Sequence, residues 1–219
     1  MKSLENDVLL CVRFLGLILI LSLCGSCFSQ EIGVLDKGRL ELQNKPKLLL
    51  GFDNNYSLLN DEPVRIMGIR YGFDYGKIKL YEGLYFLQNE IIKNKENLLN
   101  PKDTSYQKIR FTYLSTTVEY VFHENKKWEF SIPAKIGFGT GVKNTFLGDS
   151  LIKQDNPPFI PAEVSVMVLY KINRWAGISA GLGYRISLYN TNEFDGSFYS
   201  FGIKIFLGKL YRTIKPDGN

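Results

Sequence analysis

The chain contains one histidine, His123, which is the first candidate for chemistry. Glu124 follows it, but no second histidine stands four residues on, so the pair does not form a zinc-binding helix motif. We interpret His123 as a solvated turn residue. A Gly-Phe-Gly-Thr-Gly run at 137–141 resembles a phosphate-binding loop, yet it lies within an alternating strand and opens no helix. The sequence therefore predicts no catalytic, cofactor-binding or metal-binding residue.

The other candidates are charged residues that recur on one face of segments with alternating polarity. In 176–186, for example, Ile178 and Leu182 share one face, while Ser179 and Arg185 share the other. Alternation with a period of two predicts half-buried β-strands. The carboxylates of this set could form a site, but an ion-paired filling is the favoured interpretation. The charged residues concerned are Glu119, Glu129, Lys135, Glu163, Lys171, Arg185 and Lys204.

Eight such strands are predicted in all. The faces of the first and third are not fixed by the pattern, and the fourth changes phase near Leu114, which predicts a β-bulge. The strands span 48–57, 65–75, 77–87, 109–122, 128–139, 162–172, 176–186 and 198–208.

The connections between these strands alternate between short and long. This alternation is typical of an antiparallel membrane barrel with both termini in the periplasm, where turns are short and outer loops long. Residues 89–99 could form a short helix in one long loop. The short connections lie at 76–77, 123–127 and 173–174, and the long ones at 58–64, 88–107, 140–160 and 187–197.

The polarity of the faces favours an all-β, eight-stranded antiparallel transmembrane β-barrel. A soluble core would not accept so many charges together, whereas a lipid-facing exterior and a polar lumen satisfy both faces. A soluble β-sandwich with a solvated polar face is the alternative. Eight strands leave a lumen that side chains can fill, and we predict an ion-pair network with inward glycines that make room for it. The predicted interface anchors are Trp128, Tyr170, Trp175, Tyr184, Tyr199 and Tyr211.

The N-terminal segment 1–29 has the features of a secretion signal peptide. Lys2 and Arg13 precede an apolar run at 14–24 that is too short to span a bilayer. All three cysteines lie in this segment, so the mature chain has no disulfide. Gly-Ser-Cys27 resembles the end of a lipobox, and lipidation of Cys27 or an N-terminal membrane anchor are the alternatives. The net charge of +5 is spread along the chain and does not indicate nucleic-acid binding.

The predicted organisation is a signal peptide at 1–29, a periplasmic lead-in at 30–46, the barrel at 47–208 and a periplasmic tail at 209–219. The end of the barrel, Ser200-Phe-Gly-Ile-Lys-Ile-Phe-Leu207, resembles the insertion motif read by barrel-assembly machinery. It departs from that motif because about 12 residues follow Leu207.

With the strands at 128–140 and 175–188 and the Cys-Phe-Ser-Gln30 motif, this layout resembles small outer-membrane β-barrel proteins of Bacteroidota, the porin-like or PorT-like family. The architecture is similar to OmpA/OmpX-type barrels. The resemblance implies no functional residues.

We therefore expect a non-enzymatic barrel in the cell outer membrane that presents its long loops to outside partners or supports the envelope. The alternatives are an accessory of a secretion or assembly machine and a rim enzyme acting on lipid. Such an enzyme would need a His, Ser or acidic cluster near the long loops, and the lack of an outer-side histidine argues against it. The expected partners are outer-membrane lipid, the barrel-assembly machinery during biogenesis, and an extracellular or secretion-system protein. No cofactor and no nucleic acid is expected.

Overall fold

The structure is a computed structural model of the 219-residue chain. It divides into the units Met1–Gln43 and Asn44–Asn219, and the described strands belong to the second unit. The predicted signal peptide lies outside the described residues, as does most of the lead-in. The described residues are 42–59, 62–88, 91–95, 105–147, 150–189 and 195–214.

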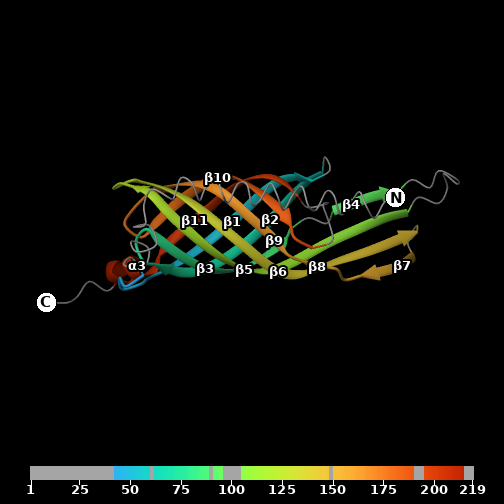
Figure 1. Cartoon of the computed structure of the whole chain (residues 1–219), viewed down its shortest axis with the longest axis horizontal. Helices are drawn as coiled ribbons and strands as arrows, with labels where there is room; N and C mark the ends of the chain where they lie inside the picture. Colours follow the sequence, from blue (N-terminus) through green and yellow to red (C-terminus); the bar gives the residue numbers. More distant parts are fainter. Residues whose placement is uncertain are drawn as a thin grey trace, which may run out of the picture. The chain divides into compact units, whose positions relative to one another are not determined.

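Eight antiparallel strands close into a barrel, as the alternation predicted (Figure 1). Going round the barrel, the order is β5, β3, β2, β1, β11, β10, β9 and β6, and the pairing of β6 with β5 closes the ring. The strands are β1 (Lys47–Leu59), β2 (Glu62–Asp74), β3 (Ile78–Leu87), β5 (Ser105–Glu124), β6 (Trp128–Leu147), β9 (Pro161–Lys171), β10 (Ala176–Ser187) and β11 (Gly196–Phe206).

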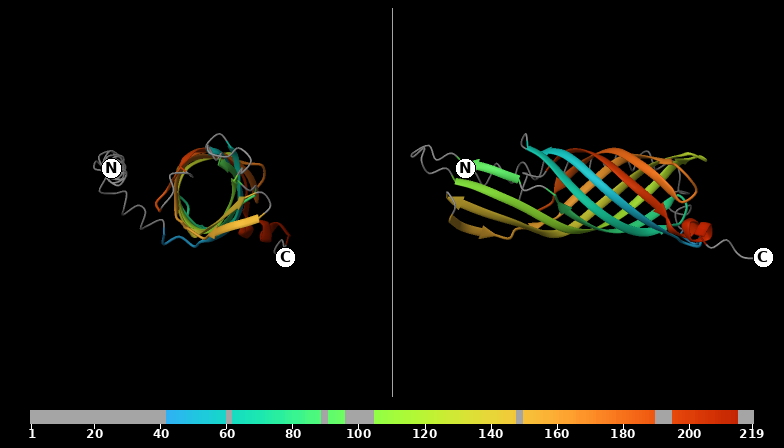
Figure 2. Two further views of the ribbon diagram at one scale, coloured as in Figure 1. Left: turned by 90° about the vertical axis from the view of Figure 1, so that its right-hand side faces the viewer. Right: turned by 180° about the vertical axis from the view of Figure 1, so that it is seen from behind.

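The described parts of two predicted long loops, 88–107 and 140–160, are instead largely β-structure. Strands β5 and β6 pair continuously from the tight turn out to Ser105 and Leu147, and the short strands β4 (Ile91–Lys95) and β7 (Ser150–Asp155) flank them. A further two-residue strand, β8 (Pro158–Phe159), also pairs with β6. Figure 2 shows β4–β7 projecting beyond the end of the barrel. We call these residues, 91–95, 105–111, 140–147 and 150–155, the extension.

Three further expectations about the backbone were wrong. The helix expected within 89–99 is replaced over 91–95 by strand β4. The long connection expected at 58–64 is a hairpin, because β1 and β2 pair out to Leu59 and Glu62. The short–long alternation therefore fails at this position. The bulge expected near Leu114 is absent, and the β5–β6 register shifts between Val121 and His123 instead.

The three connections expected to be short, at 76–77, 123–127 and 173–174, are tight turns. Between β2 and β3, Gly76 adopts a positive φ of 107°, a conformation that favours glycine, and its N–H donates to Asp74 Oδ1 at 2.8 Å. After β11 the chain forms α3 (Leu207–Ile214), so a helix occupies part of the predicted tail. Among the described residues no helix is long and apolar enough to span a bilayer.

The two faces of each strand differ in polarity. For the six strands whose faces were assigned from the sequence, the face assigned as polar points inward, as predicted. Outward positions are exposed and apolar, for example Ile69, Leu182 and Phe201, whereas inward positions such as Arg70, Glu163 and Lys204 are buried. The faces that the pattern left open are now fixed. Asp53 of β1 and Lys79 of β3 point inward, and Phe52 of β1 points outward.

Candidate functional site: the filled barrel interior

The barrel interior contains a network of charged side chains to which each of the eight strands contributes. The inward half of the alternating pattern places one or two of them on every strand, so their positions follow from the pleat. All of the central members are buried. The members in strand order are Asp53 (β1), Arg70 (β2), Lys79 (β3), Glu119 (β5), Glu129 and Lys135 (β6), Glu163 (β9), Arg185 (β10) and Lys204 (β11).

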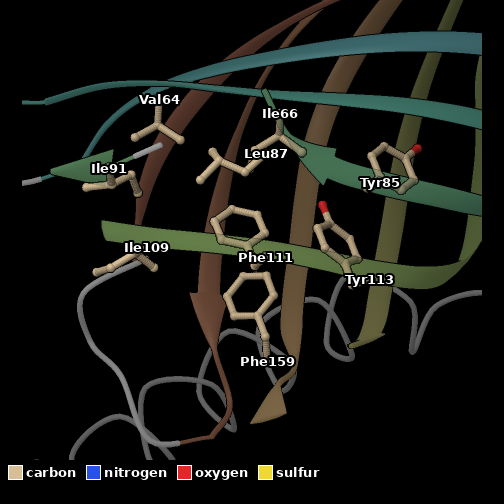
Figure 3. Packing of buried hydrophobic residues seen from close by; sticks show 9 residues of the cluster. All are labelled: Val64, Ile66, Tyr85, Leu87, Ile91, Ile109, Phe111, Tyr113 and Phe159. Atoms are coloured by element: carbon tan, nitrogen blue, oxygen red, sulfur yellow. The ribbon is translucent and has the colours of Figure 1, made fainter. Parts of the chain in front are cut away.

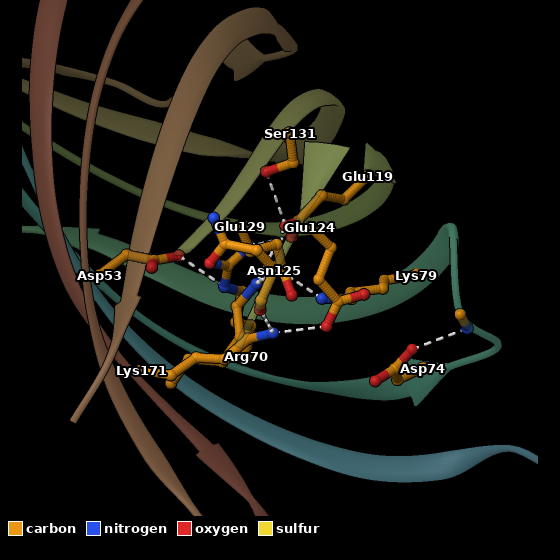
Figure 4. A network of polar contacts seen from close by, with 12 residues as sticks. Asp53, Arg70, Asp74, Lys79, Glu119, Glu124, Asn125, Glu129, Ser131 and Lys171 are labelled. Atoms are coloured by element: carbon orange, nitrogen blue, oxygen red, sulfur yellow. Dashed lines mark hydrogen bonds and ion pairs between the residues drawn. The ribbon is translucent and has the colours of Figure 1, made fainter. Parts of the chain in front are cut away.

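The part nearest the tight turns is built around Lys204. Its Nζ donates to Glu119 Oε1 at 2.9 Å and to Glu129 Oε1 at 3.3 Å, and Lys79 pairs with the same oxygen of Glu129 (Figure 4). The Ser131 hydroxyl donates to Glu119 at 2.9 Å. Two carboxylates therefore share two lysines, and every charge at this level has an opposite charge in contact with it.

Arg70 continues the network toward the middle of the barrel. Its Nη1 lies 3.8 Å from Glu119 Oε2, and its Nε lies 3.0 Å from Asp53 Oδ2. The Tyr85 hydroxyl donates to that same Asp53 oxygen at 2.6 Å. The guanidinium carbon lies 4.5 Å from the ring centroid of Tyr81, so Arg70 is held by charge and by an aromatic face.

Glu163 is the centre of a second group. It accepts from Arg185 Nε at 2.7 Å, from Lys135 Nζ at 2.9 Å and from the Tyr113 hydroxyl at 3.2 Å. Lys135 Nζ also lies 4.0 Å from the ring centroid of Tyr85, whose hydroxyl bonds to Asp53. Through Tyr85 the two groups form one continuous network.

The predicted ion-paired lumen is therefore present, with one residue misplaced and three not foreseen. Lys171 pairs with Glu124, an exposed carboxylate beside the tight turn, and lies outside the buried network. Asp53 and Lys79 were missed because the faces of their strands were ambiguous. The face of Arg70 was clear from the alternation, because it lies on the face of its strand opposite to that of Ile69. This feature of the sequence could have identified it.

Toward the other end the interior is apolar. Val64, Ile66, Leu87, Ile91, Ile109, Phe111 and Phe159 pack with the rings of Tyr85 and Tyr113 (Figure 3). We call these nine residues the aromatic plug. Tyr85 and Tyr113 stack at 5.2 Å between centroids, and Phe111 lies 4.5 Å from Phe159.

Inward glycines make room for this plug more than for the charges, contrary to the prediction. A Cβ on Gly68 would lie 2.2 Å from the ring of Tyr85, and one on Gly137 would lie 2.5 Å from the ring of Tyr113. Charged neighbours are involved at Gly51, where a Cβ would meet Arg70 Nε at 2.9 Å, and at Gly202, where it would meet Asp53 Oδ1 at 3.0 Å. Close approach of rings to backbone is thus the main reason for glycine here.

A small cavity of about 20 Å³ lies between the two charged groups, lined in part by Asn55, Ser165, Phe198 and Ser200. This is room for about one or two waters, and too little for an organic substrate. Asn55 Nδ2 and Ser200 Oγ are buried without a partner in the protein, so they are suitable ligands for such a water.

The remaining sequence candidates lie at the surface. His123 is exposed beside the tight turn, with its ring 5.7 Å from that of Phe130. Within the described part of the chain no three metal-ligating side chains come together. Of the predicted interface aromatics, Trp128 and Tyr170 form an exterior pair 4.8 Å apart, while Tyr184, Tyr199 and Tyr211 are exposed.

These features define the class of the protein: a closed eight-stranded antiparallel barrel with an apolar exterior and an interior filled by ion pairs and rings. No protein-family description matches the chain, and no curated protein is detectably similar to it.

Several solved structures resemble the barrel. Among them are Neisserial surface protein A (13% identity, 74% of this chain and 95% of that one, TM-score 0.48), the N-terminal β-barrel domain of OprF from Pseudomonas aeruginosa (11%, 74% and 98%, 0.49), and Ail, the attachment invasion locus protein of Yersinia pestis (8%, 73% and 96%, 0.44). At these scores the likenesses carry no functional argument, and the fold rests on the strand pairing.

Proposed function

We propose that this chain is a non-enzymatic β-barrel of the cell outer membrane. The observation that carries the proposal is the exterior: outward side chains on all eight strands are predominantly apolar, and many are more than 40% exposed. An apolar surface of this extent would drive aggregation in water, whereas a closed barrel satisfies its backbone within lipid. The soluble sandwich is disfavoured for the same reason.

Heat-modifiability combined with membrane fractionation tests this proposal. A folded membrane barrel migrates faster on a gel before boiling than after it, and it is expected to sediment with the outer membrane. A product that stays in the soluble fraction and migrates identically before and after boiling would contradict the proposal.

The filled interior favours a structural role for the barrel over a role as a pore. The network and the aromatic plug fill successive levels of the lumen, and the small cavity between the charged groups holds only a water or two. Purified barrel in planar bilayers is therefore expected to give no large, steady conductance. Stable openings would show that the lumen is a channel.

The extension gives the barrel a surface for binding outside partners. It replaces the predicted loops and keeps its shape through β5–β6 pairing and the stack of Tyr106 on Phe146 at 5.1 Å. Leu151 and Ile152 of its edge strand β7 are more than half exposed. Edge strands with exposed apolar residues pair readily with other chains.

Labelling of intact cells with a membrane-impermeant thiol reagent tests this orientation. Cysteine at Leu151 is expected to react, whereas cysteine at Lys126, in a tight turn at the opposite end, is expected to react only after the cells are broken. The reverse result would place the extension in the periplasm.

The second candidate is an accessory role in a secretion or assembly machine, as in one branch of the PorT-like family. The observation that favours it is α3, whose Tyr211 and Ile214 are exposed at the tight-turn end. Cross-linking from Tyr211 to a secretion component would support this role, and kinship to that family stays a prediction.

A further inference from the structure

One residue on the barrel exterior differs from its surroundings. Of the outward positions on the eight described barrel strands, one carries a carboxylate, Glu82 of β3. The outward cations Arg65, Lys108 and Arg110 all lie toward the extension end. Along β3 itself, Glu82 has Ile78 and Leu80 on one side and Leu84 and Phe86 on the other.

The carboxylate is exposed and oriented by a neighbour. In register it lies between Tyr71 of β2 and Thr116 of β5. The Thr116 hydroxyl is 2.9 Å from Oε1 and 3.1 Å from Oε2. This hydroxyl supplies one proton, whereas an ionised carboxylate offers about four acceptor sites, so most of its hydrogen-bonding capacity faces outward.

Such a group is unfavourable if lipid alone surrounds it. Ionisable side chains at hydrocarbon depth are rare, and where they occur they mark sites that pair with another group. The flanking outward residues, Tyr71, Leu84 and Leu114, are exposed and apolar or aromatic. An ionisable group surrounded by apolar side chains at this depth is therefore a candidate site for pairing with another group.

A second copy of the chain in the same orientation does not provide the opposite charge. Its outward cations would lie nearer the extension end than Glu82 does. Arg65 is opposite Tyr56 and Arg110 is opposite Val142, both closer to the extension than the level of Glu82. Two apposed Glu82 carboxylates would repel each other. A second copy in the same orientation is therefore a poor source of the complementary charge.

We propose that the β3–β5 wall around Glu82 is a lateral docking site for a membrane-embedded segment of another envelope protein. That segment carries a Lys or Arg at this depth, which pairs with Glu82, and apolar side chains that cover Tyr71, Leu84 and Leu114. Thr116 is a positioning residue that aims the carboxylate at the partner. This inference rests on the proposed outer-membrane location.

Site-specific photo-crosslinking in the native host tests the proposal. A photoreactive amino acid is placed at Leu84 or Leu114, beside Glu82, and at Leu182 on β10 as the matched control. The first two positions are expected to give one heterologous adduct whose cross-linked peptide contains Lys or Arg within an apolar segment. Glu82→Gln keeps the size and the Thr116 contact but removes the charge, and is expected to lower the adduct yield about tenfold or more.

Several outcomes overturn the proposal: an adduct of two copies of this chain, equal yields at Leu84 and Leu182, a partner peptide without a cation, or an unchanged yield in Glu82→Gln. Fractionation of the same cells separates the two hypotheses. If the barrel is in the outer membrane and no adduct forms, the docking site alone fails. If the barrel is not in the membrane fraction, the proposed function fails and the docking site with it.

Discussion

Toward the extension the barrel interior is filled by apolar side chains and stacked rings, whereas nearer the tight turns it is filled mainly by ion pairs, with a smaller apolar cluster of Leu49, Tyr81, Leu169 and Phe206 at that end. Lys204 and Glu119 are stable in the interior only together with their neighbours, because each buried charge is balanced by an adjacent opposite charge. Phe111 and Phe159 contribute independently through contact area. The same backbone thus supports two kinds of filling with different responses to mutation.

The two kinds of filling are expected to respond differently to the loss of a single side chain. Removing one member of the network leaves buried charges without partners, although removing a whole group together does not. In the plug, each truncation leaves a cavity whatever its neighbours are. Each of the following predictions tests one side of this comparison by unfolding the barrel in urea after reconstitution into lipid vesicles, with the fluorescence of Trp128 and Trp175 as the readout.

The largest effect is expected for Glu119→Leu. This change removes the acceptor of Lys204 and Ser131 and the charge nearest Arg70. A loss of about 3–5 kcal/mol in the free energy of unfolding is expected, because three buried partners lose their acceptor or counter-charge. The control is Glu124→Gln at the exposed pair with Lys171, where less than about 1 kcal/mol is expected. Equal losses in both variants would contradict the network.

A slightly smaller effect is expected for Phe111→Ala in the aromatic plug. The ring contacts Phe159 and Tyr113, and its loss leaves a cavity that costs about 3 kcal/mol. Phe111→Leu is the matched variant and should retain most of the stability. If both variants were as stable as the wild type, the plug would not be packed as the structure shows.

The two layers were not equally predictable from the sequence. Glu129, Glu163 and Arg185 were found because their strands alternate cleanly between polar and apolar positions. Ile109, Phe111 and Tyr113 were missed, and their run was interpreted as a change of phase at a bulge. The phase in fact continues unbroken, but the interior changes from polar to apolar at this level. A pattern rule that assumes one polarity for each face cannot detect such a change.

The extension was missed for a different physical reason. Residues 140–147 and 150–155 have solvent near both faces, so their side chains show no alternation and their Lys, Asn and Asp content is typical of a loop. Backbone pairing between β5, β6 and β7 holds them as strands. Pairing of this kind depends on neighbouring strands and leaves no mark in the local sequence.

Gly68→Ala is expected to have a moderate effect that reports on the junction of the two layers. The added Cβ would lie 2.2 Å from Tyr85, whose hydroxyl donates to Asp53, so the ring must move and weaken that bond. The expected loss is about 1–3 kcal/mol. Gly208→Ala, in α3 with open space around it, is the matched control and should be neutral or slightly stabilising. A neutral Gly68→Ala would mean that Tyr85 is not held against the wall.

The smallest effect is expected when one charged group is replaced as a whole. Lys135→Met, Glu163→Leu and Arg185→Met remove the three charges together, and Tyr113→Phe removes the hydroxyl that would otherwise lose its acceptor. The combined variant should lie within about 1 kcal/mol of the wild type, because no uncompensated charge remains and apolar side chains fill a similar volume. Glu163→Leu alone should lose several times more. If the single and the combined variants lost the same stability, the charges would act through their individual bonds rather than through their mutual balance, and the distinction between the two layers would fail.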